Sequence, residues 1–359
     1  MHELLDVLDD WAAADPVIAV ATVVRTSGST PRPVGARLAV SGDQRLAGSV
    51  SGGCLEADVV EEALPTLRGE RPARVLHYGI SDEMGFSVGL SCGGTVDVLV
   101  EAWRWDDTDP VVGRLRAALR AGDPVALVSV VAGELAGRRV LIDGDDLVGS
   151  LGAEAADAAA RAAGADRIET GMAGLDERDG LQLFVEPFVQ PAQMVIVGAS
   201  DIGAALTTMA QTCGYRVTVI DPRTAFLTRE RFPTADAVVT SWPDEALAGV
   251  VLGPRDAAVC LSHDPKFDEP TLTALLAGGV GYIGAIGSRR TAQKRVDRLR
   301  EMGRSEAEID RIHSPVGLDI GSRTPAEIAL SILAEAVAVR RGRSGGRLRE
   351  PQVPAAGAG

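Results

Sequence analysis

The fold of the C-terminal half is decided by one stretch of sequence, MVIVGASDIGAALTTMAQTCGYRVTVID, which spans residues 194–221. Residues 194–197 have the continuous apolar character of a buried strand, residues 198–203 form a glycine turn, and the residues up to 213 continue as a helix. A second strand ends on Asp221, 23 residues after Gly198. This order is the layout of a dinucleotide-binding βαβ unit, in which the acid reaches a ribose hydroxyl.

The turn of this unit departs from the usual glycine pattern at two positions. Ser200 stands where the backbone should approach a pyrophosphate most closely, and Asp201 adds a negative charge beside it. Both residues weaken the prediction of a nucleotide site, so NAD(P) is expected to bind poorly. Gly203 still permits close packing of the helix on the sheet. Strands and helices continue to alternate beyond the turn, which predicts a Rossmann-like, doubly wound parallel sheet for residues 191–342.

Two further positions in this domain fall where open α/β sheets bind ligands. His263 follows the predicted strand 256–261 directly, either as a site residue or as a loop histidine bonded to a neighbouring aspartate. Ser288 and Arg289 begin a helix after the predicted strand 280–286, and a helix N-terminus is a natural seat for a phosphate. The basic row at 294–300 is expected to form, in part, a solvated face. The final helix is expected to begin at Thr324, with Glu327 as its capping-box partner.

The N-terminal half is organised around GSVSGGCLE, residues 48–56. Residues 46–50 have strand character and residues 55–64 have helical spacing, so the glycines lie in the turn between them. Cys54 falls beside the helix N-terminus, where unpaired N–H groups favour an anion, and Glu56 lies in the first turn. A near-echo, SCGG, follows at residues 91–94. Either both loops face one ligand, or they hold two buried cysteines beside tight turns; the residues concerned are Gly52, Gly53, Cys54, Glu56, Cys92 and Gly93.

Length and composition set the limits of the whole chain. With 359 residues, of which 46% are hydrophobic, it has room for two domains. We expect an α/β domain with a mixed sheet at residues 1–190, with a candidate subdivision at the polar stretch 104–109, and a disordered tail at 343–359. The net charge of −14 argues against a nucleic-acid partner. Four widely spaced cysteines, no signal peptide and no long apolar run predict a cytoplasmic protein that does not enter a membrane. Cys213 and Cys260 are expected to be packing residues.

Taken together, the motifs resemble those of the xanthine dehydrogenase accessory family (XdhC/CoxI). In the N-terminal half the resemblance rests on GSTP at 28–31, SGGCLE at 51–56 and CGGT at 92–95. In the C-terminal half it rests on HDP at 263–265, YIGAIGS at 282–288 and HSPVGLDIG at 313–321. Members of the family are molybdenum-cofactor maturation factors, with an N-terminal cofactor-handling domain and a C-terminal Rossmann-like domain.

The resemblance implies an accessory protein more than a catalyst. It implies binding of a molybdopterin-type molybdenum cofactor, help with its sulfuration, and delivery to a xanthine dehydrogenase-like molybdenum hydroxylase apoenzyme. A cysteine desulfurase as partner and a homodimer are further expectations, and Cys54 is the residue expected to contact molybdenum. Two other functions stay open: an NAD(P)-dependent oxidoreductase using Asp221 and His263, and a docking scaffold that holds no cofactor. The expected cofactor-binding residues are Gly52, Gly53, Cys54, Glu56, Cys92, Gly93, Gly198, Asp221, His263, Ser288 and Arg289.

Overall fold

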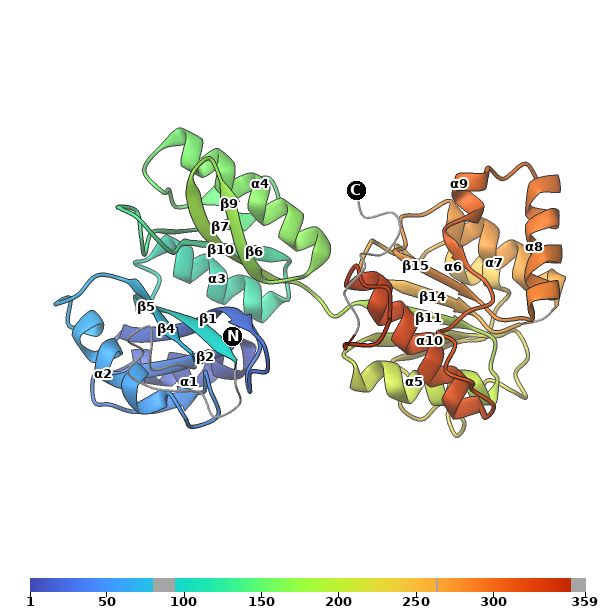
Figure 1. Cartoon of the computed structure of the whole chain (residues 1–359), viewed down its shortest axis with the longest axis horizontal. Coiled ribbons are helices and arrows are strands. Elements are labelled where there is room, and N and C mark those ends of the chain that lie inside the picture. Colours follow the sequence, from blue (N-terminus) through green and yellow to red (C-terminus); the bar gives the residue numbers. More distant parts are fainter. Residues whose placement is uncertain (80–93, 263, 350–359) are drawn as a thin grey trace. The chain divides into compact units, whose positions relative to one another are not determined.

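Two units make up the chain in the computed structural model, Met1–Gln190 and Pro191–Gly359 (Figure 1). The structure describes residues 1–79, 94–262 and 264–349. Of the sites and segments predicted from the sequence, Cys92, Gly93, His263 and residues 350–359 of the tail therefore lie outside the described residues. Among the described helices, none combines the length and apolar character needed to span a bilayer.

The C-terminal unit is built on a parallel sheet with strand order β13-β12-β11-β14-β15-β16 in the part that the structure describes. This order is that of a doubly wound dinucleotide-binding fold. It confirms the predicted Rossmann-like class. The strands are β11 (Gln193–Val197), β12 (Arg216–Ile220), β13 (Ala237–Val239), β14 (Ala257–Cys260), β15 (Tyr282–Ala285) and β16 (Ile312–His313).

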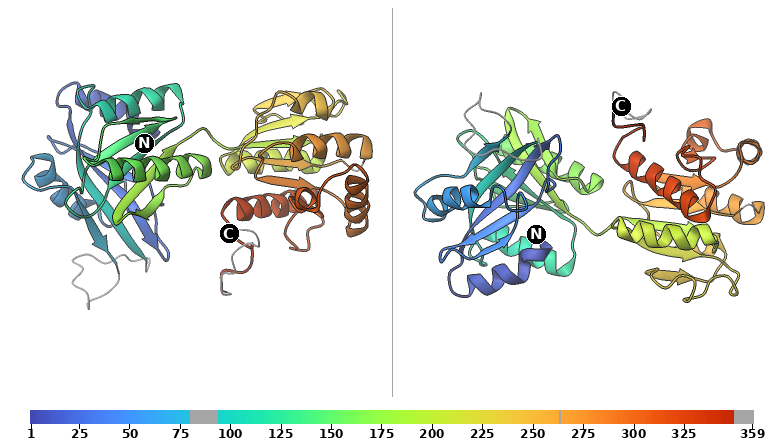
Figure 2. Two further views of the ribbon diagram at one scale, coloured as in Figure 1. Left: turned by 90° about the horizontal axis from the view of Figure 1, so that it is seen from above. Right: turned by 60° about the horizontal axis from the view of Figure 1, so that its bottom comes forward.

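Helices cover both faces of this sheet because its strands are apolar on both sides. α5 and α10 pack on one face through Leu206 and Ile332, whereas α6 to α9 pack on the other through side chains such as Leu272 and Leu299 (Figure 2). The predicted capping box of α10 is confirmed, since Thr324 accepts a hydrogen bond from the Glu327 N–H. The helices are α5 (Asp201–Thr212), α6 (Pro243–Leu247), α7 (Pro265–Leu276), α8 (Arg289–Glu301), α9 (Glu306–Ile309) and α10 (Pro325–Arg340).

The N-terminal unit contains two sheets in its described residues, with orders β3-β2-β1-β5-β4 and β8-β7-β6-β10-β9. The sequence predicted a mixed sheet in this unit, but every pairing within the two sheets is antiparallel. The crossover through α2 joins β3 at one edge of the first sheet to β4 at the other edge, so it does not place two parallel strands side by side. The strands are β1 (Val17–Ser27), β2 (Arg37–Ser41), β3 (Leu46–Gly48), β4 (Arg74–Tyr78), β5 (Thr95–Arg104), β6 (Val125–Val130), β7 (Arg139–Asp143), β8 (Asp146–Val148), β9 (Gly174–Arg178) and β10 (Leu181–Phe188).

The two sheets share one core. α2 covers the outer face of the first sheet and α4 that of the second, while α1 and α3 pack between them. Arg37 in β2 pairs with Glu186 in β10 across this core, with Arg37 Nη1 2.6 Å from Glu186 Oε1 and only 2% of the arginine side chain exposed. The helices are η1 (His2–Leu4), α1 (Leu5–Ala12), α2 (Glu56–Leu67), α3 (Pro110–Ala121) and α4 (Glu154–Thr170).

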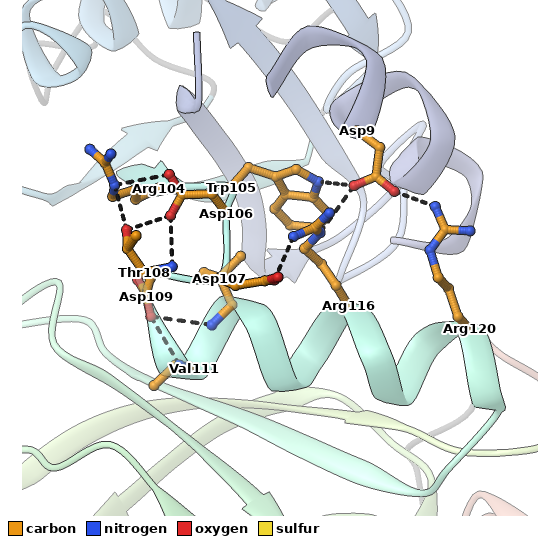
Figure 3. A network of polar contacts seen from close by, with 11 residues as sticks. Asp9, Arg104, Trp105, Asp106, Asp107, Thr108, Asp109, Val111, Arg116 and Arg120 are labelled. Carbon is orange, nitrogen blue, oxygen red and sulfur yellow. Dashed lines mark hydrogen bonds and ion pairs between the residues drawn. The ribbon is translucent and has the colours of Figure 1, made fainter. Parts of the chain in front are cut away.

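The polar stretch 104–109 connects the two sheets and is held by a network of polar contacts (Figure 3). Asp9 of α1 accepts hydrogen bonds from Trp105 Nε1 at 2.7 Å and from Arg116 Nε of α3 at 3.0 Å. Asp109 caps α3 by accepting from the Val111 N–H. The stretch thus fixes α1, the end of β5 and the beginning of α3 to one another, and both sheets belong to one unit.

Candidate functional site

The turn between β3 and α2, residues 49–55, is shaped by two adjacent glycines. Gly52 and Gly53 have φ values of 77° and 119°, a backbone region that residues with a Cβ rarely adopt. A Cβ built on Gly53 would meet nothing within 4 Å, so this glycine is required by its backbone angles and not by lack of space. Both glycines are exposed and have the backbone angles that the sequence predicted for them.

The carboxylate of Glu56 lies at the centre of this turn and binds it together. Its Oε1 accepts hydrogen bonds from Ser49 Oγ at 2.6 Å and from the Ser51 N–H at 3.0 Å. Its Oε2 accepts from Ser51 Oγ and from the Gly53 N–H, the latter at 2.8 Å. Partial burial raises the pKa of Glu56, but hydrogen bonds from Ser49 and Ser51 outweigh it and lower the pKa to about 2. Glu56 is thus ionised at neutral pH, and both its oxygens accept hydrogen bonds from its own loop.

Cys54 lies at the exposed part of the same turn. Its thiol is free and exposed, and it makes no hydrogen bond within the described residues. The α2 helix begins two residues later with Glu56, and the N-cap is Leu55. Because Glu56 binds the surrounding N–H groups, the loop is held rigid while the sulfur stays available.

A second loop, residues 28–35, borders this turn. Arg32 Nε donates to the Ser49 carbonyl oxygen at 3.3 Å, and a Cβ on Gly52 would lie 3.9 Å from Pro31 Cβ. The same loop contacts Gly94, where an added Cβ would clash with the Ser29 carbonyl oxygen and would lie 2.9 Å from Thr30 Cγ2. The turn at Cys54 and the start of β5 are therefore neighbours of one loop. Among the described residues, no group of three or more His, Cys, Asp or Glu side chains is placed to hold a metal ion.

The Gly198 turn of the C-terminal unit has its helix end satisfied from within. Ser200 is the N-cap of α5 and accepts from the Gly203 N–H at 3.2 Å. A Cβ on Gly203 would lie 2.9 Å from the Gly198 carbonyl oxygen, which confirms the close packing expected of this glycine. The charge of Asp201 is met by Arg231, whose Nη2 lies 2.7 Å from Asp201 Oδ1. Arg231 was not predicted from the sequence, because it is 30 residues away from Asp201.

Asp221, the predicted ribose ligand, is buried and already bonded on both oxygens. Its Oδ2 accepts from the Ala199 N–H at 2.8 Å, and its Oδ1 accepts from Arg223 Nε at 2.9 Å. Burial raises the pKa of Asp221, but the hydrogen bonds from Arg223 and Ala199 outweigh it and hold the pKa below its usual value. Asp221 thus ties the Gly198 turn to the end of β12. A ribose hydroxyl would have to displace Arg223.

Ser288 and Arg289 begin α8, as predicted. The Ser288 hydroxyl is the N-cap and accepts from the Thr291 N–H at 3.2 Å, while the Arg289 side chain is exposed. The Ser288 hydroxyl is therefore already used by the helix cap, and Arg289 is an exposed cationic side chain beside it.

The basic row is solvated in part, as predicted, since Lys294 and Arg300 are exposed, but Arg295 lies in the interior. Its side chain is 1% exposed and its Nη2 lies 2.8 Å from Asp268 Oδ2 on α7. It also donates to Ser314 Oγ and to the Ile286 carbonyl oxygen. Arg295 thus fixes the loops at the carboxyl ends of β15 and β16.

Two cysteines of this unit were predicted to be packing residues. Cys260 is buried against Asp268, as predicted, whereas Cys213 is exposed and is not a packing residue.

Two family models match the chain, one in each unit. The XdhC Rossmann domain matches residues 194–336, and the XdhC and CoxI family matches residues 11–79. The second match includes the Cys54 turn, and the first includes the Gly198 turn and the beginning of α8.

Relatives matched over most of their length agree with these findings. A probable xanthine dehydrogenase subunit from Bacillus subtilis (strain 168) is 27% identical over 343 residues, which are 95% of this chain and 97% of the relative. The molybdenum cofactor insertion chaperone PaoD from Escherichia coli (strain K12) is 28% identical over 319 residues, 89% of this chain and 82% of the relative. A crystal structure described as a xanthine dehydrogenase from Bacillus halodurans superposes with a TM-score of 0.64 at 26% identity, covering 97% of this chain and 98% of that one.

The predicted resemblance is therefore confirmed along both units, from the Cys54 turn to the Rossmann sheet. The chain belongs to the XdhC and CoxI family.

Proposed function

We propose that this chain is a molybdenum-cofactor chaperone that holds the cofactor as cargo and delivers it to a xanthine dehydrogenase-like apoenzyme. The observation that carries the proposal is the exposed thiol of Cys54 on a turn that Glu56 holds rigid. Relatives of similar length, one named as a molybdenum cofactor insertion chaperone and one as a probable xanthine dehydrogenase subunit, support it.

The chemistry of the turn suits such a cargo. Thiolates are among the ligands that soft metal centres prefer, and exchange of oxygen for sulfur at molybdenum is sulfur chemistry. In this proposal Cys54 contacts the cargo through sulfur, and Gly52 and Gly53 allow close approach to the main chain. Glu56 is a positioning residue, because its oxygens are already hydrogen-bonded within the loop. Cys92 and Gly93 remain proposed partners of this turn.

Separately, and within the C-terminal unit alone, we propose the beginning of α8 as a site for a phosphate group. Arg289 is exposed there, and a helix N-terminus favours negative charge. His263 stays a proposed contact in the same unit. Charge-assisted bonds to phosphate contribute about 1.5–3 kcal/mol each. Replacing Arg289 by alanine should therefore weaken phosphate binding at this helix end by about tenfold to a hundredfold.

The proposed setting is the cytoplasm, with the chain as a homodimer. A cysteine desulfurase is the proposed source of sulfur for the cargo before transfer, and the apoenzyme is the proposed acceptor. The chain itself then acts as a carrier and assists sulfuration without being the sulfur donor.

The test is retention of a molybdopterin-type cofactor under anaerobic conditions by wild type, Cys54→Ser and Cys213→Ser. Cys213 is the matched control, because it is an exposed free thiol in the other unit. We expect Cys54→Ser to retain at least tenfold less cofactor, with Cys213→Ser unchanged. Equal retention by Cys54→Ser and wild type would reject the ligand role of Cys54. A wild type that retains no cofactor yet binds the apoenzyme would favour the docking scaffold instead.

A further inference from the structure

The N-terminal unit contains a cavity of about 310 Å³ between its two sheets, on the face of the first sheet opposite α2. Its walls include the apolar side chains of Val24, Val75, Val131 and Leu175. Ligand pockets in proteins begin at about 300 Å³ and usually combine apolar walls with a few convergent polar groups. The volume therefore suits a small ligand.

Three polar side chains meet in this cavity, one from each of three adjacent strands. In the strand register Arg25 of β1 lies opposite Asp97 of β5, and Asp97 lies opposite His77 of β4. Asp97 Oδ2 accepts from Arg25 Nε at 2.6 Å, and Asp97 Oδ1 is 2.7 Å from His77 Nδ1. All three line the cavity.

A β-bulge places Arg25 on this face. Val23 pairs with Val98, but the next paired residue is Arg25, opposite Asp97, so Val24 is the extra residue. Strict alternation would set Arg25 opposite Val96, which packs in the apolar core under α2. Bulges commonly re-aim a side chain next to a functional site. Here the bulge puts both Val24 and Arg25 into the cavity wall.

The row formed by Arg25, Asp97 and His77 leaves hydrogen-bonding groups unused. Arg25 employs only Nε, its side chain is 62% exposed, and its two terminal nitrogens make no hydrogen bond in the described part of the chain. His77 is 58% exposed and its Nδ1 is held by Asp97, which leaves Nε2 for a ligand. Asp97 is only 12% exposed, and both its oxygens are occupied, so it positions the other two side chains. Arg74 also lines the cavity, but its guanidinium pairs with Glu62.

We propose that this cavity binds a small phosphate-bearing ligand between the terminal nitrogens of Arg25 and Nε2 of His77. A guanidinium presents paired N–H groups that match phosphate oxygens. Near neutral pH a phosphate carries both ionised and protonated oxygens, so it can meet either form of the imidazole. The inference does not depend on the proposed cofactor-carrying function, since it rests on neither Cys54 nor Arg289.

The test is calorimetric titration of the full-length protein with inorganic phosphate and, separately, with glycerol 3-phosphate. For wild type we expect a dissociation constant of roughly 0.1 to 5 mM, as two charge-assisted bonds would give. Arg25→Gln and His77→Gln should each weaken binding about tenfold or more. Arg68→Gln should bind like wild type, because Arg68 is an exposed arginine of the same unit that pairs with Glu70 away from the cavity. A phosphate ester that binds tenfold more tightly than inorganic phosphate would identify a phosphate group on a larger molecule. Equal affinities would identify the free anion.

A local readout keeps the result independent of folding. The side-chain nitrogen signals of His77 should shift in NMR spectra with the same saturation curve as the heat signal, while those of His2 stay unchanged. Unsaturable binding of both phosphates by wild type would overturn the proposal. So would equal affinity of Arg25→Gln and wild type, or a saturable heat signal with no shift at His77.

Discussion

The chain contains two turns of the same kind, a strand followed by glycines and a helix, and they use their acidic residues in opposite ways. At residues 49–56 Glu56 gathers the donors of its own loop and leaves Cys54 exposed. At residues 198–203 Ser200 caps the helix, and the exposed Asp201 is met by Arg231. A glycine turn before a helix is therefore not by itself a ligand site. The groups that remain unbonded after the loop has satisfied itself decide what it can bind.

The largest expected effect is loss of the clamp in the first turn. Glu56→Ala should destabilise the N-terminal unit by about 3 kcal/mol, because several donors lose a charged acceptor at once. Asp201→Ala in the second turn is the matched control and should change stability by less than about 0.5 kcal/mol, since its side chain is 80% exposed.

Urea unfolding followed by tryptophan fluorescence measures both changes. Trp11, Trp103 and Trp105 report on the N-terminal unit and Trp242 on the other. Similar losses in the two variants would contradict the contrast between the turns.

The pH dependence of stability tests the same carboxylate. The pKa of Glu56 in the folded chain is about 2, below its usual value of 4.5. Its contribution is therefore fully present above about pH 4.5 and is lost as the pH falls toward 2. We expect a loss of about 2 kcal/mol over this range, after allowance for partial exposure, and a flatter curve for Glu56→Gln. A variant curve parallel to that of wild type would show that Glu56 does not titrate in this way.

Replacing one glycine in each turn by alanine distinguishes the cost of backbone strain from the cost of a steric clash. Gly203→Ala should cost about 2 kcal/mol, because the new Cβ would lie 2.9 Å from the backbone oxygen of Gly198. Gly53→Ala should cost only about 1 kcal/mol, since its Cβ has free space and only the positive φ opposes it. Thermal unfolding of the two variants should place the larger shift in the C-terminal unit, and the reverse order would argue against these assignments.

The smallest expected signal is nucleotide binding at the second turn. Ser200 and Asp201 occupy the pyrophosphate position, and Asp221 is bonded to Arg223, so we expect NAD(H) to bind with a dissociation constant of roughly millimolar or weaker. Calorimetry measures this directly. Tight, stoichiometric binding accompanied by hydride transfer to a carbonyl compound would instead support the function of an NAD(P)-dependent oxidoreductase.

Features with local signals were predictable from the sequence. The Rossmann strands follow from short apolar runs, and the beginning of α10 follows from the Thr324 and Glu327 pair. The clamp by Glu56 was predictable in principle, because Ser49 and Ser51 lie within seven residues of it. Its consequence, that Glu56 is a positioning residue, needed the geometry.

Features that depend on long-range pairing were not predictable. Arg295 belongs to a basic row on a helix, and only the position of Asp268, 27 residues earlier, shows that it is buried. The row of Arg25, Asp97 and His77 depends on strand register and on the bulge at Val24. Neither register nor a bulge can be read from the composition of the individual strands.

The pairing of Arg37 with Glu186 has a consequence for the order of events during synthesis. The two residues are 149 positions apart, so at about 5–20 residues per second a ribosome adds Glu186 roughly 7 to 30 seconds after Arg37. Until then the guanidinium lacks the carboxylate to which it is hydrogen-bonded in the folded chain, and a charge without such a partner is costly to bury. We expect β2 to stay hydrated on the nascent chain even though β1, with which it pairs, has already been made. We therefore expect the first sheet to close only after β10, the last strand of the second sheet, has been made, and a stalled chain ending before Glu186 to remain sensitive to protease at β2.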